Sequence, residues 1–134
     1  MSRARGNALQ NALARYLARW WVHAESAGAG RNGSDVLGTP GVVWECKTAA
    51  DFKRDFRPAA WVAQAATHAR TPGGGFNLDD GEYDLPVVVY YPPGIGEMNT
   101  GNALAIVPLH VLMRVLEEAQ YTPAHNNTEK STIA

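Results

Sequence analysis

The sequence predicts a single α/β domain in which helices flank a small mixed β-sheet. Three observations indicate this class: apolar residues at helical spacing near the N-terminus, the β-branched run Pro86–Tyr91, and the alanine-rich segment Ala59–Ala69. The 134 residues suit one compact domain, and 46% hydrophobic against 19% charged residues are typical of a globular protein. We expect the domain to span residues 1–120 and a polar, flexible tail to span residues 121–134.

The first half of the chain predicts a helix followed by two short strands. A helix from Arg5 to Glu25 is indicated by an apolar stripe of Leu9, Leu13, Tyr16, Leu17 and Trp20. Glycines 28, 30 and 33 then break the helix. Extended stretches are expected at Ser34–Leu37 and Gly41–Lys47, with a tight turn over residues 38–41 between them.

The second half predicts two helices and two strands. Pro58 suits the first turn of a helix that continues through the alanine-rich segment. A glycine-rich, acidic loop over residues 71–85 precedes the buried strand 86–91, and a loop over residues 92–102 precedes a short strand at Ala103–Val107. A last helix begins at Pro108 and ends near Gln120. The resulting order α-β-β-α-β-β-α favours a mixed sheet between helices.

Several classes of protein are excluded by composition. No apolar run approaches the roughly 20 residues of a membrane helix, and the N-terminus has no apolar segment typical of a secretory signal. The single cysteine, Cys46, cannot form an internal disulfide or supply a cysteine-rich zinc site. We therefore expect a soluble cytoplasmic protein, in a host cell if the chain is encoded by a phage.

Charge is distributed unevenly along the chain. Residues 1–70 hold ten basic and five acidic residues (+5), whereas residues 71–134 hold two basic and eight acidic residues (−6), which together give the net charge of −1. A basic half can form a phosphate-facing surface on a neutral protein, although ordinary solvated charge explains the same split. The acidic loop at 78–84 could repel DNA, bind a partner or simply be solvated.

Two acidic residues and one lysine suggest a catalytic site on the two short strands. A tight turn can bring Asp35 beside Glu45, so that both carboxylates and the backbone carbonyl of Cys46 could hold one Mg²⁺ or Mn²⁺ ion. Lys47 follows Glu45 by two residues and therefore lies on the same strand face, where it could orient water or stabilise charge on a phosphate. Cys46 itself should face away from both and behave as a small buried hydrophobe.

The sequence around these residues resembles the PD-(D/E)XK nuclease core. The matching string is Gly33-Ser34-Asp35-Val36-Leu37 followed by Val42-Val43-Trp44-Glu45-Cys46-Lys47, within a region of about residues 5–70. It looks most like the small Holliday-junction resolvases of phages infecting actinobacteria. The resemblance implies a restriction-endonuclease-like fold, metal ligands at Asp35 and Glu45, and a catalytic lysine at Lys47.

Two positions depart from the family pattern. Ser34 stands where proline is usual before the aspartate. In the first helix, Gln10 stands where the resolvases usually carry a glutamate after an Arg-Gly pair, here Arg5-Gly6. An amide can coordinate a metal or hold a water, but it adds no negative charge, so a weaker metal site or a different metal preference is expected.

Further candidates surround this core. The resemblance implies that Gln64, on the alanine-rich helix, lies next to the metal site. His68 lies one turn further on and could contact phosphate or assist proton transfer, or be an ordinary helix histidine. The candidate DNA-binding cations are Arg3, Arg5, Lys53, Arg54 and Arg57. Phe52 and Phe56 could pack against DNA or anchor the loop in the core, and the four tryptophans are expected in the core or a dimer interface.

These observations predict a divalent-metal-dependent DNA endonuclease acting on branched DNA such as a Holliday junction. The resemblance implies a homodimer, because two strands must be cut symmetrically. A weak or inactive DNA-binding module on the same fold is the alternative that Gln10 suggests. A nuclease specific for flaps, single strands or RNA is a third, because a shared fold does not determine the substrate.

Overall fold

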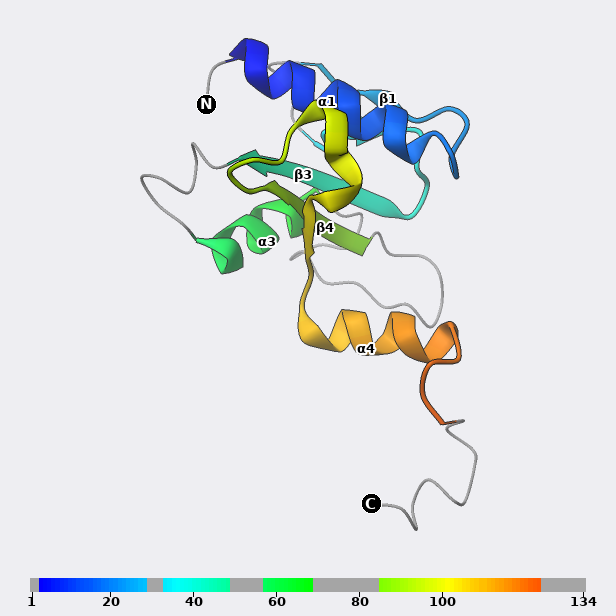
Figure 1. Ribbon diagram of the computed structural model, residues 1–134. Helices are drawn as coiled ribbons and strands as arrows, with labels where there is room; N and C mark the ends of the chain where they lie inside the picture. Colours follow the sequence, from blue (N-terminus) through cyan, green and yellow to red (C-terminus); the bar gives the residue numbers. More distant parts are fainter. Residues whose placement is uncertain (1–2, 29–32, 49–56, 69–84, 124–134) are drawn as a thin grey trace.

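The computed structural model describes residues 3–28, 33–48, 57–68 and 85–123. Within them, helices pack around a three-stranded sheet, and a two-stranded ribbon lies beside it (Figure 1). The elements in order are α1 (Arg3–Leu17), β1 (Glu25–Ser26), β2 (Val36–Leu37), β3 (Val42–Thr48), α3 (Pro58–Ala66), β4 (Leu85–Tyr91), the 3₁₀ helix η2 (Glu97–Asn102), β5 (Leu104–Ile106) and α4 (Leu109–Glu118).

The sheet is mixed, as the sequence predicts. β3 runs parallel to β4, and β4 runs antiparallel to β5, in the order β3-β4-β5. The register pairs Glu45 with Val88 and Lys47 with Tyr90. β1 and β2 form a separate antiparallel ribbon in which Ser26 pairs with Val36. The α/β class with a small mixed sheet flanked by helices is therefore confirmed.

Helix α1 covers one face of the sheet. Its apolar stripe is buried against side chains from β3 and β4 that point to the same face. The buried cluster consists of Leu9, Leu13, Ala14, Leu17, Val36, Trp44, Cys46, Val87, Val89 and Tyr91. Trp21 packs edge-on against Trp44, with ring centroids 6.2 Å apart. This is the larger of the two described cores.

Helix α3 covers the opposite face. Pro58 occupies its first turn, where the missing N–H costs no hydrogen bond. Trp61 and Ala65 are buried against Val88 and Tyr90 of β4. Because side chains alternate along a strand, every second residue of β3 also faces α3. Glu45 and Lys47 are those residues, so the chemistry-bearing face of β3 is the α3 face.

The first helix is shorter than the sequence predicts. It ends at Leu17 rather than Glu25, because the backbone N–H groups of Trp20 and Trp21 both bond to the Leu17 carbonyl in a turn. Glu25 belongs to the strand β1, which was not predicted. Trp20 is 62% exposed, so of the two expected places, the core or a dimer interface, it does not occupy the core.

Other boundaries differ by a few residues. The strand predicted at Ser34–Leu37 is limited to Val36–Leu37, the last helix ends at Glu118, and the loop over residues 92–102 contains η2. The Tyr91 hydroxyl and Thr100 Oγ1 share a hydrogen bond of 3.1 Å, which fixes η2 to β4. A 3₁₀ helix of this length has no apolar periodicity that a sequence could reveal.

The turn before β3 requires a glycine. Gly38 has a φ of +83°, and a Cβ at this position would overlap the His23 carbonyl oxygen. This close approach joins the segment after α1 to the turn between β2 and β3. The described residues contain no helix that is long and apolar enough to cross a membrane.

Candidate active site

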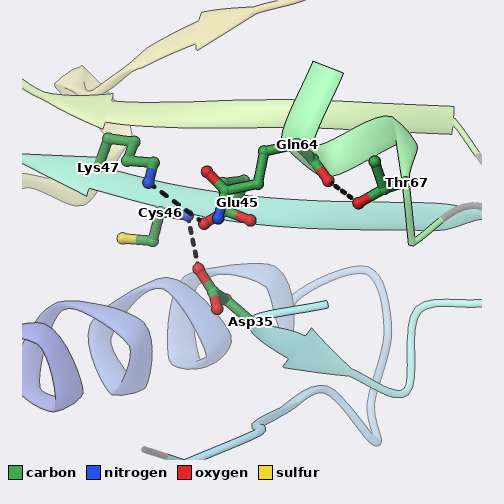
Figure 2. Close-up of polar contacts among 6 residues, drawn as sticks. All are labelled: Asp35, Glu45, Cys46, Lys47, Gln64 and Thr67. Carbon is green, nitrogen blue, oxygen red and sulfur yellow. Dashed lines mark hydrogen bonds and ion pairs between the residues drawn. The ribbon is translucent and has the colours of Figure 1, made fainter. Parts of the chain in front are cut away.

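Asp35 is fixed directly to β3. Its backbone N–H donates to the Trp44 carbonyl (2.8 Å), and its side-chain Oδ2 accepts a hydrogen bond from the Cys46 N–H (2.7 Å). Figure 2 shows the Asp35 carboxylate pointing from β2 toward β3 at the level of Glu45 and Cys46. The nine residues between Asp35 and Glu45 therefore form a turn that returns the chain alongside itself.

Ser34 ties the same segment to β3. Its hydroxyl donates to the Val36 carbonyl (2.7 Å) and accepts a hydrogen bond from the Trp44 N–H (2.9 Å). The sequence marked Ser34 only as a departure from the usual proline and did not reveal this role. The residue type could have indicated this role, because a serine hydroxyl can form hydrogen bonds with backbone groups two residues further along the chain.

Glu45 and Lys47 form a shielded ion pair on the α3 face of β3. The distance from Lys47 Nζ to Glu45 Oε2 is 3.5 Å, and their side chains are 10% and 16% exposed for Glu45 and Lys47 respectively. The Lys47 ammonium also lies 6.0 Å from the centre of the Trp61 ring. The two-residue spacing thus brings the pair together as expected, and α3 limits its access to water.

Cys46 lies between Glu45 and Lys47 in β3, and its side chain points to the opposite face, toward α1. Its side chain is buried in the cluster beneath α1, which agrees with the expected hydrophobic role. The N–H and C=O of one residue in an extended strand point to the same side. Because the Cys46 N–H binds Asp35, the Cys46 carbonyl is directed to the same edge of β3.

Burial raises the pKa of Asp35 above its ordinary value of 3.8. The main cause is desolvation of the carboxylate, and the hydrogen bond from the Cys46 N–H and the charges of Lys47 and His68 act in the opposite direction. The half-buried carboxylate thus lies next to the strand that bears Glu45, and desolvation outweighs the interactions that favour its charged form. A bound cation would relieve this cost.

Gln64 and His68 approach the site from α3. In Figure 2 the Gln64 side chain extends from the helix in the direction of Glu45. His68 follows the end of α3, and its charge acts on Asp35. It lines a hollow of about 390 Å³ together with Ser34, Val43 and the turn at residues 36–42. Ser34 and Val36, the two neighbours of Asp35 in the chain, line this hollow, whereas Asp35 and Glu45 themselves do not.

Gln10 is on α1, and its described contact is with β1 rather than with the acidic residues. Its side-chain Oε1 accepts a hydrogen bond of 3.3 Å from the Ser26 hydroxyl, which holds the amide against β1. Ser26 pairs with Val36, the residue after Asp35. Gln10 is therefore one strand away from the carboxylates, and the contact described for it is with β1.

The candidate DNA-binding residues divide into described and undescribed positions. Arg57 is exposed and directly precedes α3. Arg3 and Arg5 belong to the first turns of α1, and their side chains lie outside the described residues. Also outside them are Phe52, Lys53, Arg54, Phe56 and the acidic loop at 78–84.

A second hollow, of about 520 Å³, lies between α1 and η2. Arg15 and Arg19 line it, and the Arg19 guanidinium lies 4.9 Å from the centre of the Tyr16 ring. Neither arginine was among the DNA-binding candidates named from the sequence. Their spacing of four residues, which places them on one exposed face, was the signal for a basic surface here.

The oxygen atoms on and around Asp35, Glu45 and Cys46 are of the type that hard divalent cations bind. Two carboxylates and a backbone carbonyl are the oxygen ligands that Mg²⁺ and Mn²⁺ prefer, with water completing the shell. The described residues contain no group of three or more His, Cys, Asp or Glu side chains placed to hold a metal. A site here would therefore depend on the two acids together with backbone, amide and water oxygens.

Comparisons with protein-family models, curated proteins and solved structures found no match for this chain.

Proposed function

We propose that this protein is a divalent-metal-dependent DNA endonuclease of the PD-(D/E)XK type that cuts branched DNA such as a Holliday junction. The observation that carries the proposal is the bond between the Asp35 carboxylate and the Cys46 N–H (2.7 Å). It joins the isolated aspartate to the strand bearing Glu45 and Lys47. This bond supports the interpretation of the short motif, which alone could occur by chance, as one site.

Asp35, Glu45 and the Cys46 carbonyl are the groups that would hold a Mg²⁺ or Mn²⁺ ion, with Gln10 as a further candidate through its amide oxygen. Bound there, such an ion activates water and neutralises phosphate charge. The desolvation of Asp35 supports this assignment, because a shielded carboxylate is costly unless a cation compensates it, and Lys47 is paired with Glu45.

The chain's own residues position the reacting groups. Lys47 is held by Glu45 at 3.5 Å and is aimed along the α3 face, where its ammonium orients the attacking water or stabilises the phosphate oxygens. Gln64, which extends in the direction of Glu45, adds an amide hydrogen-bonding group at the same place. Water attacks phosphorus in line, the P–O3′ bond breaks, and 5′-phosphate and 3′-hydroxyl ends result.

DNA binding is assigned to the basic half of the chain. Arg57 and His68 flank α3 at its two ends, so they bracket the candidate site. Arg3, Arg5, Lys53 and Arg54 complete the proposed set, and Arg15 on α1 with Arg19 just after it extends the set to the hollow beside η2. Their contacts to phosphate would supply affinity that falls as salt rises.

A DNA-binding module without cleavage is the second candidate. One observation favours it: the Gln10 amide is neutral and is engaged by Ser26, so the acids that could bind metal are Asp35 and Glu45. Two carboxylates give weaker divalent binding than three. This candidate predicts the same junction binding and no turnover.

Cleavage of a matched panel of DNA substrates tests both candidates. The full chain is incubated with four-way junction, flap, single-stranded and linear duplex DNA of the same sequences, in Mg²⁺, in Mn²⁺ and in EDTA. Symmetric metal-dependent cuts in the junction are expected. Cutting of flaps or single strands alone would reassign the substrate.

Binding is measured in the same panel by gel shift in Ca²⁺. Tight junction binding without cutting in either metal would favour the non-cleaving module. Equal cutting by the wild-type chain and by Asp35→Asn would indicate a contaminating nuclease and contradict the proposal.

A further inference from the structure

The hollow between α1 and η2 has the size of a ligand site and lies apart from the acids beside β3. Its volume of about 520 Å³ falls within the range of roughly 300–1,000 Å³ that is typical of sites for small organic molecules. Figure 1 shows η2, drawn in yellow, lying against α1, and the two elements are in contact. Arg15 lies in the last turn of α1 and Arg19 in the turn that follows, and both line the hollow.

The positive charge of this hollow exceeds the negative charge of its lining. Arg15 and Arg19 are both exposed, and among the residues that the structure describes neither forms an ion pair. Glu97 is the acid among the lining residues, so two guanidinium groups face one carboxylate. A guanidinium carries planar N–H donors whose geometry matches the oxygens of a phosphate. The chemistry that complements the hollow is therefore that of a phosphate group.

Two aromatic rings lie next to these arginines. The Arg19 guanidinium is 4.9 Å from the centre of the Tyr16 ring, and the Trp20 ring is 5.4 Å from the same centre at an interplanar angle of 59°. Tyr16 is half-buried and lines the hollow, whereas Trp20 is 62% exposed and presents most of its surface to solvent. An exposed indole beside a guanidinium is a platform on which a nucleotide base can stack.

The η2 side of the hollow positions the tyrosine ring. Gly101 lies so close to it that a Cβ at this position would be 3.2 Å from the Tyr16 Cε1 atom, so a larger residue would displace the ring. The hydrogen bond between the Tyr91 hydroxyl and Thr100 Oγ1 fixes η2 to the sheet. Tyr16, which connects Arg19 with Trp20, is thus in place before a ligand binds, and such preorganisation lowers the entropic cost of binding.

We propose that this surface binds an unpaired nucleotide of single-stranded DNA, with a phosphate at Arg15 and Arg19 and a base stacked on Trp20. In a duplex the faces of the bases are covered by their neighbours, so an aromatic platform selects unpaired over paired DNA. The choice of DNA rests on the proposed function. The inference deepens that function by giving the chain a contact for unpaired segments of branched DNA on the α1 side of the sheet, whereas Glu45 and Lys47 face α3.

The first test measures binding of the full chain to labelled oligodeoxythymidylate and to a duplex of the same length, by fluorescence anisotropy in EDTA. Trp20→Ala is expected to lower the affinity for the single strand about 10-fold and that for the duplex less than about 2-fold, because it removes only the stacking contact. Tyr121→Ala is the matched control, since Tyr121 is 80% exposed and follows α4. A wild type that does not bind the single strand, or equal losses on both DNAs, would overturn the proposal.

The salt dependence of binding tests the two arginines. The double substitution Arg15→Gln with Arg19→Gln should reduce the slope of log affinity against log salt by about 1.4, at about 0.7 for each phosphate contact to a single strand. Trp20→Ala should leave this slope unchanged. Circular dichroism verifies that each variant is folded. An unchanged slope in the folded double variant would overturn the assignment of the phosphate to this hollow.

Tryptophan fluorescence separates stacking from a structural role of Trp20. Binding of oligodeoxythymidylate should quench the emission of the wild type. Trp20→Phe should keep most of the affinity, because phenylalanine also offers an aromatic face, but should lose the quenching. Full quenching in the phenylalanine variant would place the base on another tryptophan and overturn the assignment.

Two further outcomes separate this inference from others. Tighter binding of an RNA strand of matched sequence than of the DNA strand would overturn the assignment to DNA, since the 2′-hydroxyl is what distinguishes the two at one site. Junction cleavage by a chain that does not bind single strands would overturn this inference alone. Single-strand binding that depends on Trp20, without cleavage in any metal, would overturn the proposed cleavage alone.

Discussion

The outer edge of β3 and the outer face of α4 violate the usual distribution of side chains in opposite ways. Beside β3 the chain buries the carboxylate of Glu45, half-buries that of Asp35 and shields Lys47. On α4 it exposes leucine and methionine side chains that would be more stable in a core. Both arrangements cost stability in the isolated chain.

The shielded acids beside β3 and the exposed apolar side chains of α4 would each be stabilised by a different kind of contact. Buried acids are compensated by cations and by hydrogen bonds, whereas exposed apolar side chains are compensated by another apolar surface. Deviations from ordinary folding rules are expected where function imposes them. The comparison thus separates a candidate site for small charged groups from an exposed apolar surface.

The largest expected effect is loss of cleavage when either acid is neutralised. Asp35→Asn and Glu45→Gln should each lower the junction-cleavage rate by about 10³-fold or more, because the metal loses a charged ligand. The rate is measured by single-turnover cleavage of labelled junction. Glu25→Gln, which neutralises an exposed acid on β1, should keep the wild-type rate. If Glu25→Gln lost as much cleavage rate as Asp35→Asn and Glu45→Gln, the two proposed metal ligands would not differ from an ordinary surface acid.

Removing the ammonium of Lys47 should have the next largest effect. Lys47→Met keeps the aliphatic stem beside Trp61 but lowers the cleavage rate by about 10²-fold or more. Lys47→Arg should recover part of the rate while junction binding stays constant. A methionine variant with the wild-type rate would show that the ion pair with Glu45 is structural.

The hydroxyl of Ser34 should contribute measurably to stability. Ser34→Ala removes the bonds to Trp44 and Val36 and should lower the free energy of unfolding by about 1–2 kcal/mol. Thr67→Ala is the matched control, since its hydroxyl bonds to the Gln64 carbonyl at an exposed position. Urea unfolding measures both. Equal effects would mean that the attachment of Asp35 to β3 does not depend on Ser34.

The pH dependence of stability should report the burial of Asp35. Because the folded-state pKa is raised above 3.8, the folded chain binds this proton more tightly than the unfolded chain does. The stabilising effect is complete below about pH 3.8 and is lost as pH rises through the folded-state pKa. In EDTA, Asp35→Asn should therefore be relatively more stable near neutral pH, measured by thermal unfolding from pH 4 to 7. Parallel curves for both proteins would contradict this account.

The smallest expected effect concerns Gln10. Gln10→Glu restores the charge that the resembled family carries and should tighten Mn²⁺ or Mg²⁺ binding by several-fold, measured by calorimetry. Ser26→Ala tests whether the hydroxyl restrains the amide, and it should leave the affinity of the wild-type site nearly unchanged. A glutamate without effect on metal affinity would place position 10 outside the site.

Local sequence patterns predicted much of the fold. The stripe of α1, the run in β4 and Pro58 at the start of α3 each correspond to an observed element. The end of α1 was wrong because Trp20 continues the apolar spacing although the backbone turns at Leu17. β1 was missed because a two-residue strand depends on pairing with β2, and pairing between distant segments leaves no local pattern.

Only part of the candidate site could be predicted from the sequence. The period of two along β3 fixes Glu45 and Lys47 on one face, so their proximity follows from the sequence. The attachment of Asp35 through the Cys46 N–H and the Ser34 hydroxyl depends on tertiary geometry. The outward face of α4 could not be predicted, because an apolar stripe indicates that a face will be covered but not what covers it.

β3 serves two purposes with alternate residues, which constrains how this protein can evolve. Trp44 and Cys46 complete the core beneath α1, and Glu45 and Lys47 face α3. A single-residue insertion or deletion within Val42–Thr48 would exchange the two sets, burying charge under α1 and removing the acid from the site. Length changes should therefore be tolerated in loops and eliminated from this strand, and a library of single-codon insertions would show a gap there.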